Sequence, residues 1–344
     1  MRSFFIVNAW RTGSTLLAAI LGAHPRIVTL IESRWFANIS CYLKRLQRIP
    51  PGRRPEIMYK FLTTAQLMDQ LSTSPDTLWT IVLRYYGSPD RILPVLMAEF
   101  AQRTKPSAAL WGEKSCLHSL YIPHIDHAYP DTRFIHLVRD PRATVNSIAK
   151  PSFADASNDW CVAAHAYRRF NEAIELSLGR IVPERHMRLH YEDLVSRPEE
   201  ELARCCAFLG VEFDSAMLAH ERARRNFASV GSETAARKMT AAFVSEWKTS
   251  LSPTQVRCIE RFTSHLHSTS HYARSNPKTR RFAYLLTLAI LQAKDLCLRL
   301  VESLVHMARG RPFVWSRLGI HLRVTLGASG TLISRLRRAH SRPA

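Results

Sequence analysis

The chain has 344 residues, of which 46% are hydrophobic, and its formal net charge is +20. This length and composition exclude a disordered or collagen-like chain, and they suffice for a full core in one α/β domain with an appendage or in two domains. The seven cysteines are scattered, with no C-x-x-C pair and no zinc-type spacing, so we expect reduced thiols in the cytoplasm and no metal site.

The first predicted elements are a strand, a tight loop and a helix. The apolar run from Phe4 to Val7 predicts the strand, and a helical pattern of leucines begins at Leu16. The segment "RTGST" between them (11–15) places a glycine among small hydroxyl residues. A helix start carries unpaired N–H groups and partial positive charge, so we predict that this loop binds phosphate or sulfate. An ordinary helix cap explains the loop alone equally well. The short start leaves no room for a signal peptide, so export is not expected.

The second predicted strand lies in "RIVTLIESRWF" (26–36) and ends at Glu32. A carboxylate at the end of a parallel strand is well placed for chemistry, although a surface position at the strand end is the alternative. Residues 39–107 predict a helical insertion over the sheet, interrupted by "RIPPGRRP" (48–55).

The strand and helix pattern then resumes. "ALWGEKS" (109–115) predicts a strand that runs into a charged loop, where Lys114 has Glu113 as an alternative salt-bridge partner. "HSLYIPHIDHAYP" (118–130) predicts a helix, and "RFIHLVRDPRATVNSIAK" (133–150) predicts a buried strand followed by a helix.

The rest of the main domain continues this alternation, with a helix over 159–180, a strand over 186–194 and a helix over 197–210. Repeated strand-loop-helix units predict an α/β fold with a P-loop-like central parallel sheet flanked by helices. We assign this fold to a domain of residues 1–270 and treat residues 271–344 as a basic helical C-terminal extension.

The C-terminal extension holds much of the positive charge, because residues 273–344 contain 14 Lys/Arg and 2 acidic residues. Its long helical pattern (282–310) has an uncharged stretch of only 12 residues, whereas a membrane span needs about 20. The extension could pack on the main domain, contact an anionic membrane peripherally, or bind nucleic acid. Leucines recur at helical spacing between the arginines, which favours packing with some membrane affinity, and nucleic-acid binding lacks aromatic platforms.

A second anion site is predicted where Arg139 ends a strand and Ser147 follows eight residues later, inside the next helix. Two anion sites at two strand ends imply a ligand with two separated phosphates. The first loop is no Walker A motif, because no lysine follows Gly13 and no glycine precedes it by five positions. A nucleoside triphosphate kinase is therefore disfavoured.

Both elements resemble those of the sulfotransferases that use 3′-phosphoadenosine 5′-phosphosulfate. In that family R-[ST]-G-[ST]-[ST]-L holds the 5′-phosphosulfate, and R-D-P-R…S holds the 3′-phosphate. The likeness runs from about residue 3 to about residue 265. It implies that the donor is bound without a metal by Arg11, Thr12, Gly13, Ser14, Thr15, Leu16, Arg139 and Ser147. Lys238, with Ser229 or Ser232 nearby, resembles the family's late basic residue that closes over the cofactor.

The chain looks most similar to the tyrosylprotein sulfotransferases and related bacterial proteins, in which A-H-P and then E-[TS]-R follow the first helix. Residues 23–25 and 32–34 match these motifs, whereas Trp10 stands where proline usually precedes the arginine. The resemblance implies a glutamate base with an arginine beside it, and cations must absorb the charge that builds on the sulfuryl group. The predicted catalytic residues are Glu32, Arg34, Arg11 and Lys114.

The sequence therefore predicts a sulfotransferase that acts on a hydroxyl group. The acceptor stays open among carbohydrate, lipid-linked and peptidyl hydroxyls, and the oligomeric state is not predicted. The alternative is a non-catalytic protein with the same fold that binds a nucleotide or docks on a membrane. Loss of the base would favour that alternative, and Glu32 is present.

Overall fold

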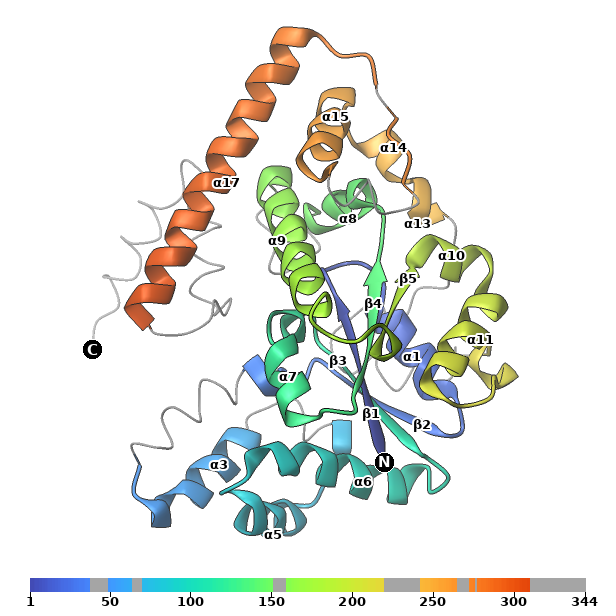
Figure 1. The fold of residues 1–344 in the computed structure, drawn as a ribbon, viewed down its shortest axis with the longest axis vertical. Coiled ribbons are helices and arrows are strands. Elements are labelled where there is room, and N and C mark those ends of the chain that lie inside the picture. The colour runs from blue at the N-terminus through green and yellow to red at the C-terminus, as the bar shows by residue number, and fades with distance from the viewer. Residues whose placement is uncertain are drawn as a thin grey trace, which may run out of the picture. The chain divides into compact units, whose positions relative to one another are not determined.

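A computed structural model describes residues 1–37, 49–63, 70–150, 159–219, 242–264, 272–275 and 277–309 (Figure 1). The chain divides into two compact units. One unit comprises Met1–Arg139 and Ala173–Ala241, and the other comprises Asp140–Glu172 and Ala242–Ala344. The division of the chain at residue 270 stays a prediction.

The first unit is built on a five-stranded sheet in the order β2-β3-β1-β4-β5, in which every pair is parallel. Its strands are β1 (Arg2–Asn8), β2 (Ile27–Ile31), β3 (Leu110–Lys114), β4 (Arg133–Val138) and β5 (His186–His190). The predicted α/β fold is confirmed. Lys114 pairs in register with Ile6 on one side and Ile31 on the other, so the carboxyl ends of three strands meet at one edge of the sheet.

The core of this unit explains why its strands are nearly continuous apolar runs. A parallel sheet is covered on both faces, and Phe4 and Phe5 on consecutive positions of β1 are both fully buried. The ring of Phe5 packs edge-on against Trp111, with the ring centroids 5.7 Å apart.

Helix α1 (Ser14–Ala23) packs so closely on β2 that a Cβ at Gly22 would collide with the Thr29 hydroxyl. The helix end is fixed by Lys105, whose ammonium group donates to the carbonyls of Gly22, His24 and Ile27 at 2.7, 2.7 and 2.8 Å. The bonds to Gly22 and His24 satisfy carbonyls at the C-terminus of the helix, and the bond to Ile27 ties the helix end to the start of β2.

The remaining described elements of this unit are helical. Residues between 49 and 104 form η1 (Pro51–Arg53), α3 (Arg54–Thr63), α5 (Pro75–Tyr85), η2 (Pro89–Arg91) and α6 (Ile92–Thr104). The predicted helix over 118–130 is split into η3 (Cys116–Leu120) and α7 (Ile122–Ala128). After η4 (Pro183–Arg185) and β5 come α10 (Tyr191–Ser196), α11 (Pro198–Leu209) and η5 (Ser215–Met217).

The strand predicted over 186–194 is too long. It ends at His190, and Tyr191 begins helix α10. Glu192 and Asp193 lie in the first turn of that helix, where the helix dipole favours negative charge.

The second unit is helical in its described part. It contains α8 (Pro141–Ile148), α9 (Trp160–Leu178) as far as Glu172, α13 (Ala242–Ser245), α14 (Trp247–Ser250), α15 (Pro253–Phe262) and α17 (Arg281–Arg309). The buried Arg142 guanidinium donates to Glu260 at 2.7 Å and lies 4.1 Å from the Trp247 ring centroid. No helix in the described part of the chain has the length and apolar composition to cross a bilayer.

Candidate active site

The candidate site lies at the carboxyl edge of the sheet, where the loop after β1 enters helix α1. Arg11 and Gly13 both have left-handed backbone conformations, with φ of 62° and 92°. Thr12 is buried, and its hydroxyl donates to the carbonyl of Ala9 at 3.1 Å. The loop thus turns sharply before α1 begins at Ser14, and Gly13 offers this helix no side-chain cap. A helix start of this kind presents N–H groups to an anion.

The ring of Tyr191 packs against this loop. A Cβ on Gly13 would lie 2.5 Å from the Tyr191 ring, so both the left-handed backbone and this close approach require glycine. The Arg139 guanidinium stacks 4.7 Å from the centroid of the same ring and donates to the carbonyl of Arg11 at 2.9 Å. The structure therefore brings the predicted phosphate-binding arginine to the predicted anion loop.

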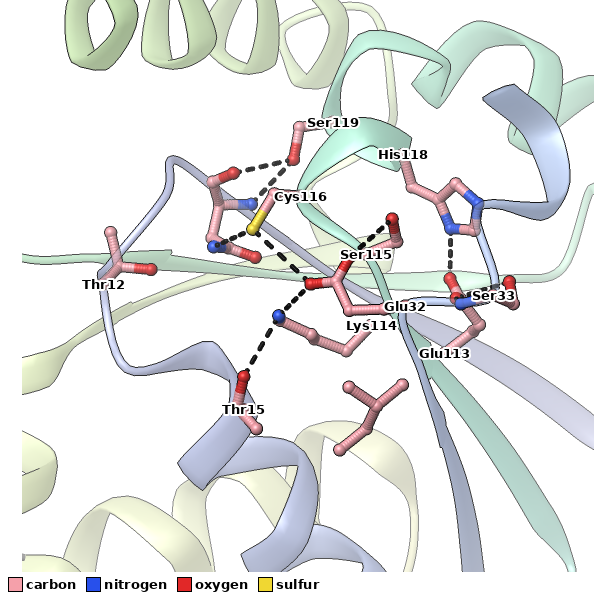
Figure 2. Close-up of polar contacts among 12 residues, drawn as sticks. Thr12, Thr15, Glu32, Ser33, Glu113, Lys114, Ser115, Cys116, His118 and Ser119 are labelled. Carbon is pink, nitrogen blue, oxygen red and sulfur yellow. Dashed lines mark hydrogen bonds and ion pairs between the residues drawn. The ribbon is translucent and has the colours of Figure 1, made fainter. Parts of the chain in front are cut away.

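Glu32, Lys114 and Thr15 meet at the centre of the site (Figure 2). The buried ammonium group of Lys114 contacts Oε1 of Glu32 and donates to the Thr15 hydroxyl at 3.2 Å. Lys114 pairs with Glu32 rather than with Glu113 because consecutive side chains of a strand point to opposite faces. One cation thus links the candidate base to the first turn of α1.

The charges of this pair stabilise each other. Burial opposes ionisation of Glu32, but the positive charge and hydrogen bond of Lys114, together with Arg34, lower the pKa of its carboxyl below the ordinary value. Burial likewise opposes the charge of Lys114, and Cys116 and Glu32 outweigh it to raise the pKa of the ammonium group. Glu32 is therefore ionised, and ready to accept a proton, at neutral pH.

Further polar groups surround the Glu32 carboxylate. The Ser115 hydroxyl donates to Oε2 at 3.3 Å, and the Cys116 sulfur lies 4.0 Å from Oε1. Cys116 in turn accepts from the Asn8 amide at 3.3 Å. The end of β1 and the segment after β3 thus converge on this carboxylate (Figure 2).

A buried network holds the backbone beside Glu32. Oε1 of Glu113 accepts from the Ser33 hydroxyl at 2.7 Å and from its N–H at 3.2 Å. Oε2 of Glu113 contacts Nδ1 of His118, while Nε2 of His118 accepts from the N–H of Phe36 at 3.2 Å. An acceptor at Nε2 places the proton of a neutral imidazole on Nδ1.

The network matters because Glu32 and Arg34 have left-handed backbone conformations, with φ of 54° and 53°. Such conformations cost free energy in residues other than glycine and persist only where surrounding contacts hold them. Ser33, between the two, is fixed by Glu113. The strained turn therefore aims Glu32 at the loop.

Not every predicted residue can be placed in this cluster. Arg34 is exposed, and Ser147 is half-buried on α8 in the other unit. Lys238, Ser229 and Ser232 lie outside the described residues. Sequence reasoning did not identify Tyr191, Ser115, Asn8 or the Ser33–Glu113–His118 network as parts of the site. The only sequence signal for most of them is their proximity to the predicted motifs.

The sequence profile of the Sulfotransferase family matches residues 3–215. The chain is 26% identical to "Protein-tyrosine sulfotransferase" of Drosophila melanogaster, over 64% of this chain and 40% of that protein. It is 27% identical to "Protein-tyrosine sulfotransferase 2" of Gallus gallus, over 64% of this chain and 54% of the relative. The chain thus spans about half the length of these curated relatives.

A solved structure supports the same fold. The sulfotransferase domain from the Synechococcus PCC 7002 olefin synthase superposes with a TM-score of 0.59 at 25% sequence identity, covering 79% of this chain and 95% of that domain. The residues that the family profile matches, 3–215, include the loop after β1 and the strand ends that carry Glu32 and Lys114.

Proposed function

This chain belongs to the Sulfotransferase family, and we propose that it transfers the sulfuryl group of 3′-phosphoadenosine 5′-phosphosulfate to a hydroxyl acceptor, with Glu32 as the general base. One observation carries the proposal. The Lys114 ammonium group contacts the Glu32 carboxylate and donates to Thr15 in the first turn of α1. These contacts support the proposal, because they hold the candidate base and a cation together beside the predicted anion-binding loop.

We assign the 5′-phosphosulfate of the donor to the loop and first turn formed by residues 11–16. The left-handed backbone at Arg11 and Gly13 supports this assignment, because it lets the N–H groups of the loop and helix start face one ligand. We assign the 3′-phosphate to Arg139 and Ser147, and the closing contact to Lys238. The bond from Arg139 to the loop supports the arginine assignment.

In the proposed reaction the acceptor oxygen attacks sulfur while the bond from sulfur to the bridging phosphate oxygen breaks. The hydroxyl proton passes to Glu32, which is ionised at neutral pH. Lys114 and Arg11 stabilise the negative charge that builds on the sulfuryl group and on the departing oxygen. The products are a sulfate ester and 3′-phosphoadenosine 5′-phosphate.

The acceptor is proposed only as a class. The names of the relatives make a peptidyl tyrosine hydroxyl one candidate, and carbohydrate and lipid-linked hydroxyls are the others. We also propose a reducing compartment, because the described cysteines Cys116, Cys161, Cys205, Cys206, Cys258 and Cys297 are free thiols.

A transfer assay tests the proposal. The full chain is incubated with donor labelled in the sulfuryl group and with a tyrosine peptide, an oligosaccharide and a hydroxylated lipid in parallel. We expect label on one acceptor class with the natural chain and none with Glu32→Gln. If 3′-phosphoadenosine 5′-phosphate binds but no acceptor is labelled, the non-catalytic nucleotide-binding alternative is favoured.

A further inference from the structure

Helix α17 has an unusual distribution of polarity. Between residues 282 and 300 its charged side chains are Lys294, Asp295 and Arg299, and all three form ion pairs within the second unit. Lys294 pairs with Asp159 at 2.5 Å, and Arg299 pairs with Asp295 at 2.9 Å and with Glu172 at 3.3 Å. The charged side chains of this stretch of α17 therefore pair within its own unit.

The buried face of α17 is well anchored. Asp295 also contacts Nδ1 of the buried His165 at 2.5 Å. Leu291 and Leu298 are buried on the same side of the helix. These contacts define which face of α17 is turned inward.

The opposite face of α17 is exposed and apolar. The exposed residues between 282 and 300, all of which the structure describes, include no charged side chain. Phe282 is 79% exposed, and Leu296 is 59% exposed. The large side chains of this apolar stripe are Phe282, Leu285, Leu286, Ile290, Leu296 and Leu300.

The spacing of the stripe makes it continuous. Phe282, Leu286 and Ile290 follow one another at four-residue spacing, as do Leu296 and Leu300, and Leu285 comes three residues after Phe282. These spacings return to the same side of a helix. Ala289 and Ala293, also exposed, fill the gaps. A helix on the surface of a water-soluble protein normally turns its polar face outward. Here the polarity is reversed, and a contiguous exposed apolar surface of this kind marks an interaction site.

Positive charge lies at the N-terminal end of the stripe. Lys278, Arg280 and Arg281 are exposed there, directly before Phe282. We propose that the apolar stripe of α17 binds the surface of an anionic lipid bilayer. The helix lies in the interface with the stripe in the acyl boundary, and the three cations contact lipid phosphates, as in other interfacial helices.

The lipid surface explains both features together. An apolar face alone would suit a second protein, and cations alone would suit any polyanion, but an apolar stripe with adjoining cations matches the two layers of an anionic membrane. The inference is independent of catalysis, because none of the residues that carry it is assigned to the donor or to the reaction.

Sedimentation with vesicles tests the inference on the full chain. The probes are phosphatidylcholine vesicles with and without phosphatidylglycerol, at low and high salt. We expect the natural chain to bind the phosphatidylglycerol vesicles and to bind more weakly at high salt. The double variant Leu286→Gln/Ile290→Gln should bind at least about 100-fold more weakly, given the free energy of burying two such side chains. The triple variant Lys278→Gln/Arg280→Gln/Arg281→Gln should lose roughly fivefold in affinity for these vesicles for each cation removed.

The matched control is Leu83→Gln/Leu176→Gln, which alters two leucines that are exposed outside α17 and should leave vesicle binding unchanged. Unchanged binding by the stripe variant would overturn the proposal. The proposal would also be overturned if the natural chain self-associates through the stripe in the absence of lipid. The same holds if the stripe variant loses thermal stability but still binds vesicles. These two results would assign the stripe to a second copy or to the chain's own packing.

Discussion

The Lys114 ammonium group touches the Glu32 carboxylate across the ends of two neighbouring strands, although 82 residues separate the two positions. Strands β2 and β3 pair in register so that Lys114 lies opposite Ile31, the residue before Glu32. The Glu32 N–H also donates to the carbonyl of Lys114 at 2.6 Å. Sheet register therefore brings the candidate base and its cation together.

Replacement of Glu32 tests its role as the base. Glu32→Gln keeps the size of the side chain and one oxygen that can accept from Lys114, but it removes the basicity. We expect turnover to fall by roughly 10²- to 10⁴-fold, the usual cost of losing general-base catalysis. Binding of 3′-phosphoadenosine 5′-phosphate, measured by calorimetry, should change little. The control is Glu99→Gln on α6, and turnover of Glu32→Gln within a few-fold of the natural chain would assign proton transfer to another group.

Replacement of Lys114 should shift the pH dependence of the reaction. Lys114 lowers the pKa of Glu32, while burial acts in the opposite direction. Lys114→Met removes the positive charge that lowers the pKa of Glu32, so this pKa should rise. The acidic limb of the kcat/KM profile should therefore move to higher pH. The measurement is a pH–rate profile for both proteins. An unchanged acidic limb with a lower rate would mean that this limb reports a group other than Glu32.

The buried network of Ser33, Glu113 and His118 should hold Glu32 in position. Ser33→Ala removes the hydroxyl that donates to Glu113 and accepts from the N–H of Trp35. We expect the free energy of unfolding to fall by about 1–3 kcal/mol, because buried polar groups lose a hydrogen-bond partner. We also expect kcat to fall while nucleotide binding is retained. The control is Ser107→Ala, an exposed serine that donates to the carbonyl of Pro25. A normal kcat in a destabilised Ser33→Ala would limit the network to stability.

Lys105 should stabilise the end of α1. Its ammonium group satisfies three carbonyls, so Lys105→Met should lower the free energy of unfolding by about 1–3 kcal/mol in chemical denaturation. Burial lowers the pKa of Lys105 to about 8. The folded state therefore binds fewer protons than the unfolded state above that pH, and stability from this residue increases as pH rises through that range. The difference between natural chain and variant should widen above pH 8, and a constant difference would contradict the lowered pKa.

Arg139 should distinguish nucleotides by their 3′-phosphate. Arg139→Gln removes the charge of the guanidinium group and its bond to the carbonyl of Arg11. We expect it to weaken 3′-phosphoadenosine 5′-phosphate far more than adenosine 5′-phosphate, because only the former carries the second phosphate. Ser147→Ala should show the same selectivity to a smaller degree. Equal losses for both nucleotides would argue that Arg139 only supports the loop.

Local pattern was enough to predict the fold, and it also predicted the elements of the candidate site. The apolar runs, the glycine at position 13 and the helix starts are set by contacts within a few residues, and they predicted a parallel sheet with an anion loop. The strand over 186–194 was predicted too long because Tyr191 also fits a strand. Its place in a helix depends on acidic residues in the first turn and on packing against Gly13.

Only the tertiary structure decided which charged groups pair. The sequence offered Glu113 as a partner for Lys114, but strand alternation turns Glu113 toward Ser33 and His118, and sheet register brings Glu32 to Lys114. Likewise, leucine spacing predicted helix α17, whereas ion pairs to distant residues decided that its charged side faces inward. Such pairings depend on the register and docking of segments far apart in the chain, which no local pattern of residues encodes.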